Sequence, residues 1–180
     1  IDTYVGRAMM DPAEVTIAEL LRAADYRTGI YGKWHLGDNY PMRPMDQGFE
    51  DSLIHRGGGI GQPSDPIGAE GKYTDPTLIK NGVETSMKGY CTDIYFDGAM
   101  DFIEAAAKRK DNFFTYIATN APHGPYHDVP EKLYQEYLKV DFRPIMINKN
   151  PSPARLKSET DKLARICAMI TNIDENVGRL

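Results

Sequence analysis

Two short stretches carry residue types that suit the binding of a tetrahedral dianion. The first places Lys33 and His35 two residues apart in a glycine-bounded segment, and the second is 120–127, where His123 lies between two prolines. Lysine supplies a compact positive charge with three hydrogen-bond donors, and histidine can donate a hydrogen bond or shuttle a proton. If these side chains converge on one crevice, they can hold such an anion and act on it.

Each of these residues also has a structural interpretation. Lys33 could be a solvated surface lysine, His35 a hydrogen-bonded structural histidine, and His123 part of a rigid turn. Their joint position favours a functional role, because both stretches follow a predicted strand. In open parallel sheets, ligands gather beyond the carboxyl ends of the strands. Spacing alone goes no further than this.

The elements that must position these residues follow an order of helix, strand and loop. A capping box at 16–19 predicts a helix over 16–25, and a short aromatic and β-branched run predicts a strand over 26–31. Residues 113–119 form a nearly continuous apolar run, which is typical of a buried parallel strand. This order predicts an α/β fold with a mostly parallel sheet flanked by helices.

Apolar residues at helical spacing predict further helices over 93–108, with Thr92 as N-cap, over 131–138 and over 155–178. The first and the last of these should flank the sheet together with the helix over 16–25.

Residues 37–90 differ in character, because they are rich in glycine and proline. They are expected to form long loops, with a possible small hairpin closed at Asn81-Gly82. The run Gly57–Gly61 lacks the spacing of a nucleotide-binding loop and does not lead from a strand into a helix. We expect it to form a flexible loop near the mouth of a pocket.

The bulk composition excludes two classes of partner. The net charge is −5 and the isoelectric point is near 5.4, without the basic stripe that a nucleic-acid-binding protein needs to neutralise phosphates. No apolar run approaches the ~20 residues that span a bilayer. We therefore expect neither nucleic-acid binding nor a membrane span.

Four blocks of sequence together resemble the type I, formylglycine-dependent sulfatases of the alkaline-phosphatase-like superfamily. The blocks are spread in the family's order over nearly the whole chain, at 16–37, 44–50, 113–125 and 173–180. The first contains Gly-Lys-Trp-His-Leu-Gly, and the second resembles the family's Pro-x-x-x-Gly-Phe-Asp/Glu step. The resemblance implies that residues 1–180 are a central fragment of the α/β catalytic domain of a sulfuric ester hydrolase.

The same resemblance implies roles for three residues. Lys33 would contact the sulfate and the aldehyde-hydrate nucleophile, His35 would hydrogen-bond that nucleophile, and His123 would bind a sulfate oxygen and assist departure of the alcohol. Outside the family pattern, His55 and Arg56 are candidates for contact with the organic part of the substrate. His127 is a similar candidate because it lies close to His123 in the chain.

The chain also departs from the family pattern. Asp25 stands where the family usually has glycine, so Asp25 is expected to adopt a left-handed conformation. More seriously, the chain contains no Cys- or Ser-x-Pro-x-Arg, no early Asp-Asp pair and, after residue 112, no late Asp-Asn pair. We expect no metal ligands here, with the Ca²⁺ implied for the parent enzyme bound outside this chain. The isolated chain should therefore be inactive.

Two alternatives stay open. A phosphatase or phosphonate hydrolase of the same superfamily would share the fold but use another nucleophile. A non-catalytic remnant would only bind anions or partners. For the sulfatase interpretation, the expected substrate is a small-molecule or saccharide sulfate ester. Family habit places the parent protein in the periplasm or outside the cell.

Overall fold

The computed structural model describes residues 9–180. Its contacts divide the chain into two units, one ending at Asn120 and including Leu180, the other covering Ala121–Arg179. Each unit has a cluster of buried apolar side chains of its own.

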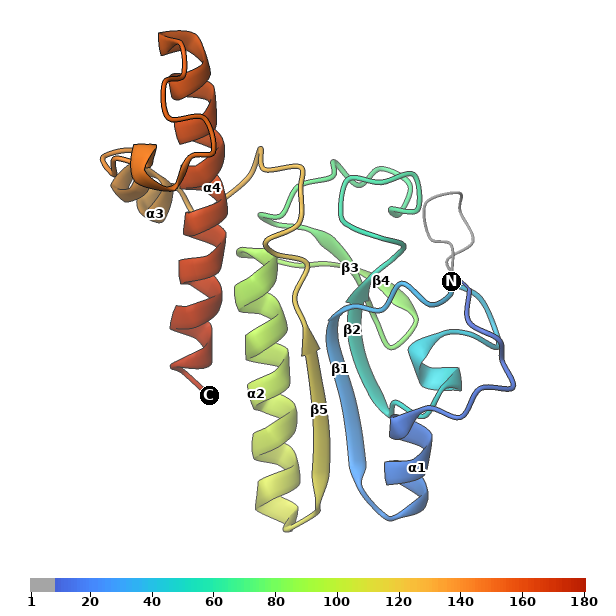
Figure 1. Ribbon diagram of the computed structural model, residues 1–180. Coiled ribbons are helices and arrows are strands. Elements are labelled where there is room, and N and C mark those ends of the chain that lie inside the picture. The colour runs from blue at the N-terminus through green and yellow to red at the C-terminus, as the bar shows by residue number, and fades with distance from the viewer. Residues whose placement is uncertain (1–8) are drawn as a thin grey trace. The chain divides into compact units, whose positions relative to one another are not determined.

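A five-stranded sheet forms the centre of the first unit, with the strand order β4-β3-β2-β1-β5 (Figure 1). β1 is parallel to both of its neighbours, β2 and β5, whereas β3 and β4 form an antiparallel hairpin on the outer side of β2. The predicted α/β class is confirmed. The elements of this unit are α1 (Ile17–Ala23), β1 (Arg27–Lys33), the 3-10 turn η1 (Pro44–Asp46), β2 (Asp51–His55), β3 (Thr77–Lys80), β4 (Val83–Ser86), α2 (Cys91–Arg109) and β5 (Phe113–Ala118).

The helix that leads into β1 begins at the predicted capping box but ends at Ala23, two residues before the predicted end. The Thr16 hydroxyl accepts a hydrogen bond from the Glu19 amide at 3.1 Å, and the Glu19 carboxylate accepts one from the Thr16 amide at 2.8 Å. At the other end Asp25 is left-handed, with a φ of 60°. An aspartate tolerates this conformation better than most residues, so the chain can turn there and enter β1.

The prediction that Thr92 caps α2 is wrong. The helix begins at Cys91 with Tyr90 as its N-cap, and no side chain closes that cap. Thr92 lies in the first turn and is fully buried. Its side chain therefore belongs to the interior of the first unit.

Alternate residues of the strands pack on opposite faces of the sheet. On one face, Ile30 of β1 and Ile54 of β2 join a cluster that includes Ala18 of α1. On the other, Tyr31 packs against Phe102 of α2 with the ring centroids 6.2 Å apart. Because successive side chains of a strand point to opposite faces, the same strands contribute residues to the cores on both sides of the sheet.

β5 is parallel, as predicted, but it is not buried. It is the edge strand of the sheet, and Phe113 and Tyr116 are 39% and 47% exposed. Its contact with β1 is nevertheless very close. A Cβ atom added to Gly32, whose φ is +117°, would lie only 2.0 Å from the carbonyl oxygen of Ala118.

The segment 37–90 is more regular than its composition suggests. It contains β2 and the predicted hairpin, in which Asn81 and Gly82 both have positive φ, as a tight two-residue turn requires. In the run Gly57–Gly61, predicted to form a flexible loop near the mouth of a pocket, Gly57–Ile60 are buried and Gly61 is exposed.

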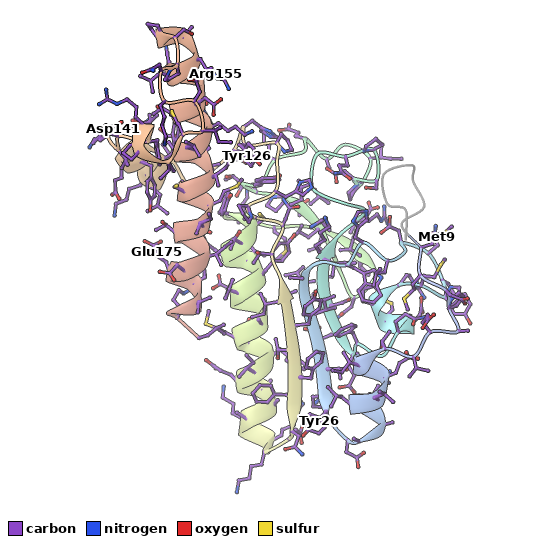
Figure 2. The ribbon with its side chains drawn as sticks, viewed as in Figure 1. Met9, Tyr26, Tyr126, Asp141, Arg155 and Glu175 are labelled. Atoms are coloured by element: carbon purple, nitrogen blue, oxygen red, sulfur yellow. The ribbon has the colours of Figure 1, made fainter. Side chains whose placement is uncertain are left out.

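The second unit consists of α3 (Glu131–Tyr137), the 3-10 turn η2 (Arg143–Ile145) and α4 (Pro153–Val177), close to the predicted helices over 131–138 and 155–178. Arg155 and Glu175 mark opposite ends of α4 (Figure 2). Arg165 of α4 holds the unit together, because its guanidinium donates to the Asp161 carboxylate at 3.0 Å and to the carbonyl of Tyr126 at 3.0 Å.

Within residues 9–180, no helix is both long enough and apolar enough to cross a bilayer.

Candidate active site

Lys33 and His55 lie side by side at the carboxyl edge of the sheet. Lys33 is the last residue of β1 and His55 the last residue of β2, and the two are register partners in the parallel ladder. Burial lowers the pKa of the Lys33 ammonium, because the charged group has lost part of its hydration. An anion bound beside Lys33 would be favoured for the same reason.

Trp34 fixes the turn between Lys33 and His35. Its ring is 8% exposed and packs edge-on against Phe49 with the ring centroids 5.9 Å apart. The indole nitrogen donates a hydrogen bond to the carbonyl of Met42 at 2.8 Å. Trp34 thereby anchors the chain to the core directly after the end of β1.

His35 has a left-handed backbone, with a φ of 55°, and its ring lies against the backbone of Gly58. A Cβ atom added to Gly58 would lie 2.8 Å from Cε1 and 3.1 Å from Nε2 of His35. The segment after β1 and the segment after β2 therefore meet at this imidazole. Sequence reasoning singled out His35 but did not find its partner Gly58, since the glycine run carries no signal for this contact.

The other two candidates in the first unit, His55 and Arg56, differ in exposure. His55 is 2% exposed, with Nδ1 3.0 Å from the carbonyl oxygen of Arg56. Arg56 is partly exposed, and Nη1 lies 3.0 Å from the Glu84 carboxylate in β4. Arg56 also lines a pocket of about 220 Å³, together with Tyr40 and Arg43. Of the two, Arg56 has the accessible side chain.

His123 and His127 belong to the second unit, and both are exposed. Nδ1 of His123 lies 2.5 Å from the carbonyl oxygen of Gly124. His123 follows the end of β5 in the chain, and β5 ends beside β1, where Ala118 is the register partner of Gly32. The roles assigned to His123 and His127 remain predictions.

Asn120, at the start of the segment that follows β5, is a polar residue that sequence reasoning did not select as a site candidate. It follows β5 and is only 3% exposed. Neither atom of its amide has a hydrogen-bond partner within residues 9–180. A buried amide without partners costs free energy, so Asn120 marks a polar interior position next to the predicted site. Its place at the head of the stretch 120–127 was the only available signal.

Across the described residues, no cluster of three or more histidine, cysteine, aspartate or glutamate side chains could hold a metal ion. The predicted site residues at the carboxyl edge of the first unit, Lys33, His35 and His55, offer nitrogen atoms, whereas Ca²⁺ takes oxygen ligands. These three side chains therefore do not fit a Ca²⁺ ion.

A family model described as Sulfatase matches residues 10–180, which is most of the chain. The chain belongs to the sulfatase family. Among curated sulfatases, it is 32% identical over 127 residues to N-acetylgalactosamine-6-sulfatase of Homo sapiens, covering 64% of this chain and 23% of that protein. It is 33% identical over 118 residues to N-acetylglucosamine-6-O-sulfatase of Bacteroides thetaiotaomicron, covering 66% of this chain and 18% of that protein. The chain thus spans about a quarter or less of the length of these two relatives.

Solved sulfatase structures share the fold. A putative sulfatase from Bacteroides fragilis superposes with a TM-score of 0.73 at 18% identity, covering 95% of this chain and 40% of that one. A second structure, solved in complex with its substrate D-glucosamine-2-N,6-O-disulfate, superposes with a TM-score of 0.58 at 22% identity, covering 95% of this chain and 46% of that one. At these identities the likeness establishes the fold of the sulfatase family for this chain.

Proposed function

We propose that the longer protein represented by this sulfatase chain hydrolyses sulfate esters. The observation that carries the proposal is the position of Lys33. A partly desolvated ammonium ends β1 at the carboxyl edge of the sheet, inside the Gly-Lys-Trp-His-Leu-Gly block of a chain that belongs to the sulfatase family. Sulfate transfer needs the peripheral oxygens of the sulfate neutralised and its leaving oxygen protonated, and a lysine and histidines are chemically suited to these needs.

In this proposal three residues have separate tasks. Lys33 binds a sulfate oxygen and neutralises charge as the ester bond breaks. His35 would hold the aldehyde-hydrate nucleophile by a hydrogen bond. After sulfate transfer it would accept the proton of the remaining hydroxyl, so that the hydrate collapses to the aldehyde and sulfate leaves. His123 contacts a second sulfate oxygen and donates a proton to the departing alcohol, a general-acid contribution worth about 10²–10⁴-fold.

The groups that the resemblance places outside this chain complete the reaction. A formylglycine hydrate would be the nucleophile, and Ca²⁺ would neutralise part of the sulfate charge. The family's Asp-Asp and Asp-Asn pairs, expected in the flanking sequence, would hold this ion. No residue of the described chain is assigned to either task. The isolated chain is proposed to bind the anion without turning over the ester.

A saccharide sulfate is the proposed substrate class. Two curated relatives are named for the 6-sulfate of an amino sugar, and a structural neighbour was solved with a glucosamine disulfate. In this chain Arg56, Tyr40 and Arg43 line the same pocket, which offers guanidinium and aromatic groups to a polar ring. We assign Arg56 to the organic part of the substrate, with His55 and His127 as further candidates. A periplasmic or secreted location is proposed with this substrate.

The experiment is to sequence the gene on both sides of this segment and to assay the longer protein. A Cys- or Ser-x-Pro-x-Arg segment upstream and an Asp-Asn pair downstream are expected. The longer protein should then release inorganic sulfate from a chromogenic aryl sulfate and from a 6-sulfated amino sugar. Release of phosphate from the matching phosphate esters, without sulfate release, would instead favour a phosphatase of the same superfamily.

A further inference from the structure

Gly58 fills a narrow space between two polar side chains. On one side is the imidazole of His35, which would lie 2.8 Å from an added Cβ. On the other is the side-chain oxygen of Gln62, which would lie 3.0 Å from the same atom. Real Cβ atoms do not approach neighbours this closely, so only a residue without a side chain fits while His35 stays where it is. The backbone φ of Gly58 is not in the left-handed region, so space and not conformation requires glycine here.

The backbone on both sides of this contact is itself held in place. The Gly57 amide donates to the Asp38 carboxylate at 3.3 Å, which joins the segment after β2 to the segment after β1. The Gly58 amide donates to the side-chain oxygen of Gln62 at 3.1 Å. The whole run Gly57–Ile60 is buried. These residues form a fixed wall, because the whole run is buried and the amides of Gly57 and Gly58 both have acceptors.

We infer that the glycine turn, Gly57–Gly59, is a positioning element that holds the imidazole of His35 in its working place. His35 needs such a support because its backbone is in a left-handed conformation, which is strained for a non-glycine residue. A catalytic group must be held within about 0.5 Å of its productive position by the residues around it. Gly58 is thus a positioning residue, and the catalytic meaning of the contact rests on the function proposed above.

Gly58→Ala is the decisive variant. The atoms that block the added methyl group are the far ends of the His35 and Gln62 side chains, so the fold should survive while the imidazole moves. Gly178→Ala is the matched control, since an added Cβ there would be 3.4 Å from its closest neighbour, an ordinary contact. The chain of 180 residues has four histidines, so the Cε1–H resonance of each histidine can be assigned by replacing that histidine with glutamine.

The measurement is the ¹H–¹³C spectrum of the histidine rings. We expect Gly58→Ala to shift the His35 Cε1–H resonance and to leave those of His123 and His127 in place, with no change for Gly178→Ala. An unchanged His35 resonance in Gly58→Ala would overturn the inference. If Gly58→Ala fails to fold, the contact between His35 and Gly58 can still be tested in the unaltered chain. A nuclear Overhauser effect between the His35 Cε1 proton and the Gly58 α-protons is expected, and its absence would refute the contact.

This test is independent of turnover. If the longer protein hydrolyses no sulfate ester but the ring contact is present, the proposed function fails and the positioning inference stands. If the longer protein is active, Gly58→Ala should lower kcat more than it raises KM, because a displaced His35 impairs the reaction more than ground-state binding. Full kcat in Gly58→Ala would contradict the positioning role.

Discussion

Lys33 and His55 occupy the same register position at the ends of two adjacent parallel strands. The parallel ladder places both at the carboxyl edge of the sheet, and the segments that leave this edge meet where His35 lies against Gly58. A lysine that has lost hydration at such a position is suited to an anion, since a bound dianion restores the interactions that the ammonium has lost. This relationship leads to the first prediction.

Lys33→Met should abolish the stabilisation of the chain by sulfate without weakening the fold. Sulfate that binds the folded chain raises its melting temperature by mass action. The substitution removes the charge that binds the anion. It also removes a partly desolvated ammonium, so the variant should unfold at the same temperature as the unaltered chain, or above it, when sulfate is absent. Differential scanning calorimetry with sulfate and with chloride at matched ionic strength measures both effects. Equal sulfate stabilisation in the two proteins would contradict the assignment.

Gly32→Ala should strongly destabilise the first unit, by roughly 2–4 kcal/mol. The added methyl group would meet the carbonyl oxygen of Ala118, a backbone atom that can move only if β5 separates from β1. Gly68→Ala is the control for this prediction, because it introduces backbone strain without such a clash. Gly68 also has a positive φ, of +84°, but no atom lies within 4 Å of its added Cβ. In urea unfolding, Gly68→Ala should lose only the free energy that its left-handed conformation costs, about 1–2 kcal/mol. Similar losses for both variants would argue against the close strand contact.

Asp51 should make the fold sensitive to acid. Burial raises the pKa of its carboxyl group, but hydrogen bonds from Lys80, Tyr31 and Asn81 outweigh that effect, and the pKa is lowered overall. Two of these bonds are short, at 2.8 Å from Lys80 and 2.5 Å from Tyr31. A depressed carboxyl pKa stabilises the folded state above the unfolded pKa of about 3.9. That stabilisation is lost as the pH falls through the lower, folded-state value.

Asp51→Asn therefore tests the acid dependence. At pH 7 the variant should be about 1–3 kcal/mol less stable than the unaltered chain in urea unfolding, because a charged acceptor is lost. The difference should shrink below about pH 4. Glu104→Gln, on an exposed part of α2, is the control and should show no such convergence. If the difference in unfolding free energy between Asp51→Asn and the unaltered chain stays constant in acid, the prediction is contradicted.

Arg56→Ala should leave stability nearly unchanged. Its ion pair with Glu84 joins side chains that are 33% and 47% exposed, and pairs of this kind contribute about 0–1 kcal/mol. Glu84→Ala should cost as little. In the longer protein, only Arg56→Ala should raise KM for a sulfated amino sugar, because only Arg56 lines the pocket. A rise of KM in both variants would mean that the ion pair, rather than contact with the substrate, matters.

Local chemistry made much of the fold predictable. The capping box of α1, the left-handed Asp25 and the Asn81-Gly82 turn each depend on a few neighbouring residues, and all three are found in the structure. The positions of Lys33 and His35 after a strand followed from the same kind of pattern. Their chemical roles came from the family resemblance.

What could not be predicted depends on contacts between distant segments. The apolar run of β5 is equally compatible with a central and an edge strand, because its position is set by which strands lie beside it. β2 was hidden among glycines and prolines, and its five residues pair with β1 across more than 20 positions of the chain. Gly58 was invisible for the same reason, since the residue that requires it, His35, belongs to another segment.

The central claim is that Lys33 serves a sulfate-ester hydrolase. Its most direct test is the rate of sulfate release by the longer protein with Lys33→Met, compared with Lys108→Met on α2, where the lysine side chain is 78% exposed. Removal of one charge-stabilising group at a reacting centre typically lowers kcat by about 10²–10³-fold. We predict a loss of this order for Lys33→Met and unchanged activity for Lys108→Met. Sulfate release that is unaffected by Lys33→Met would contradict the account.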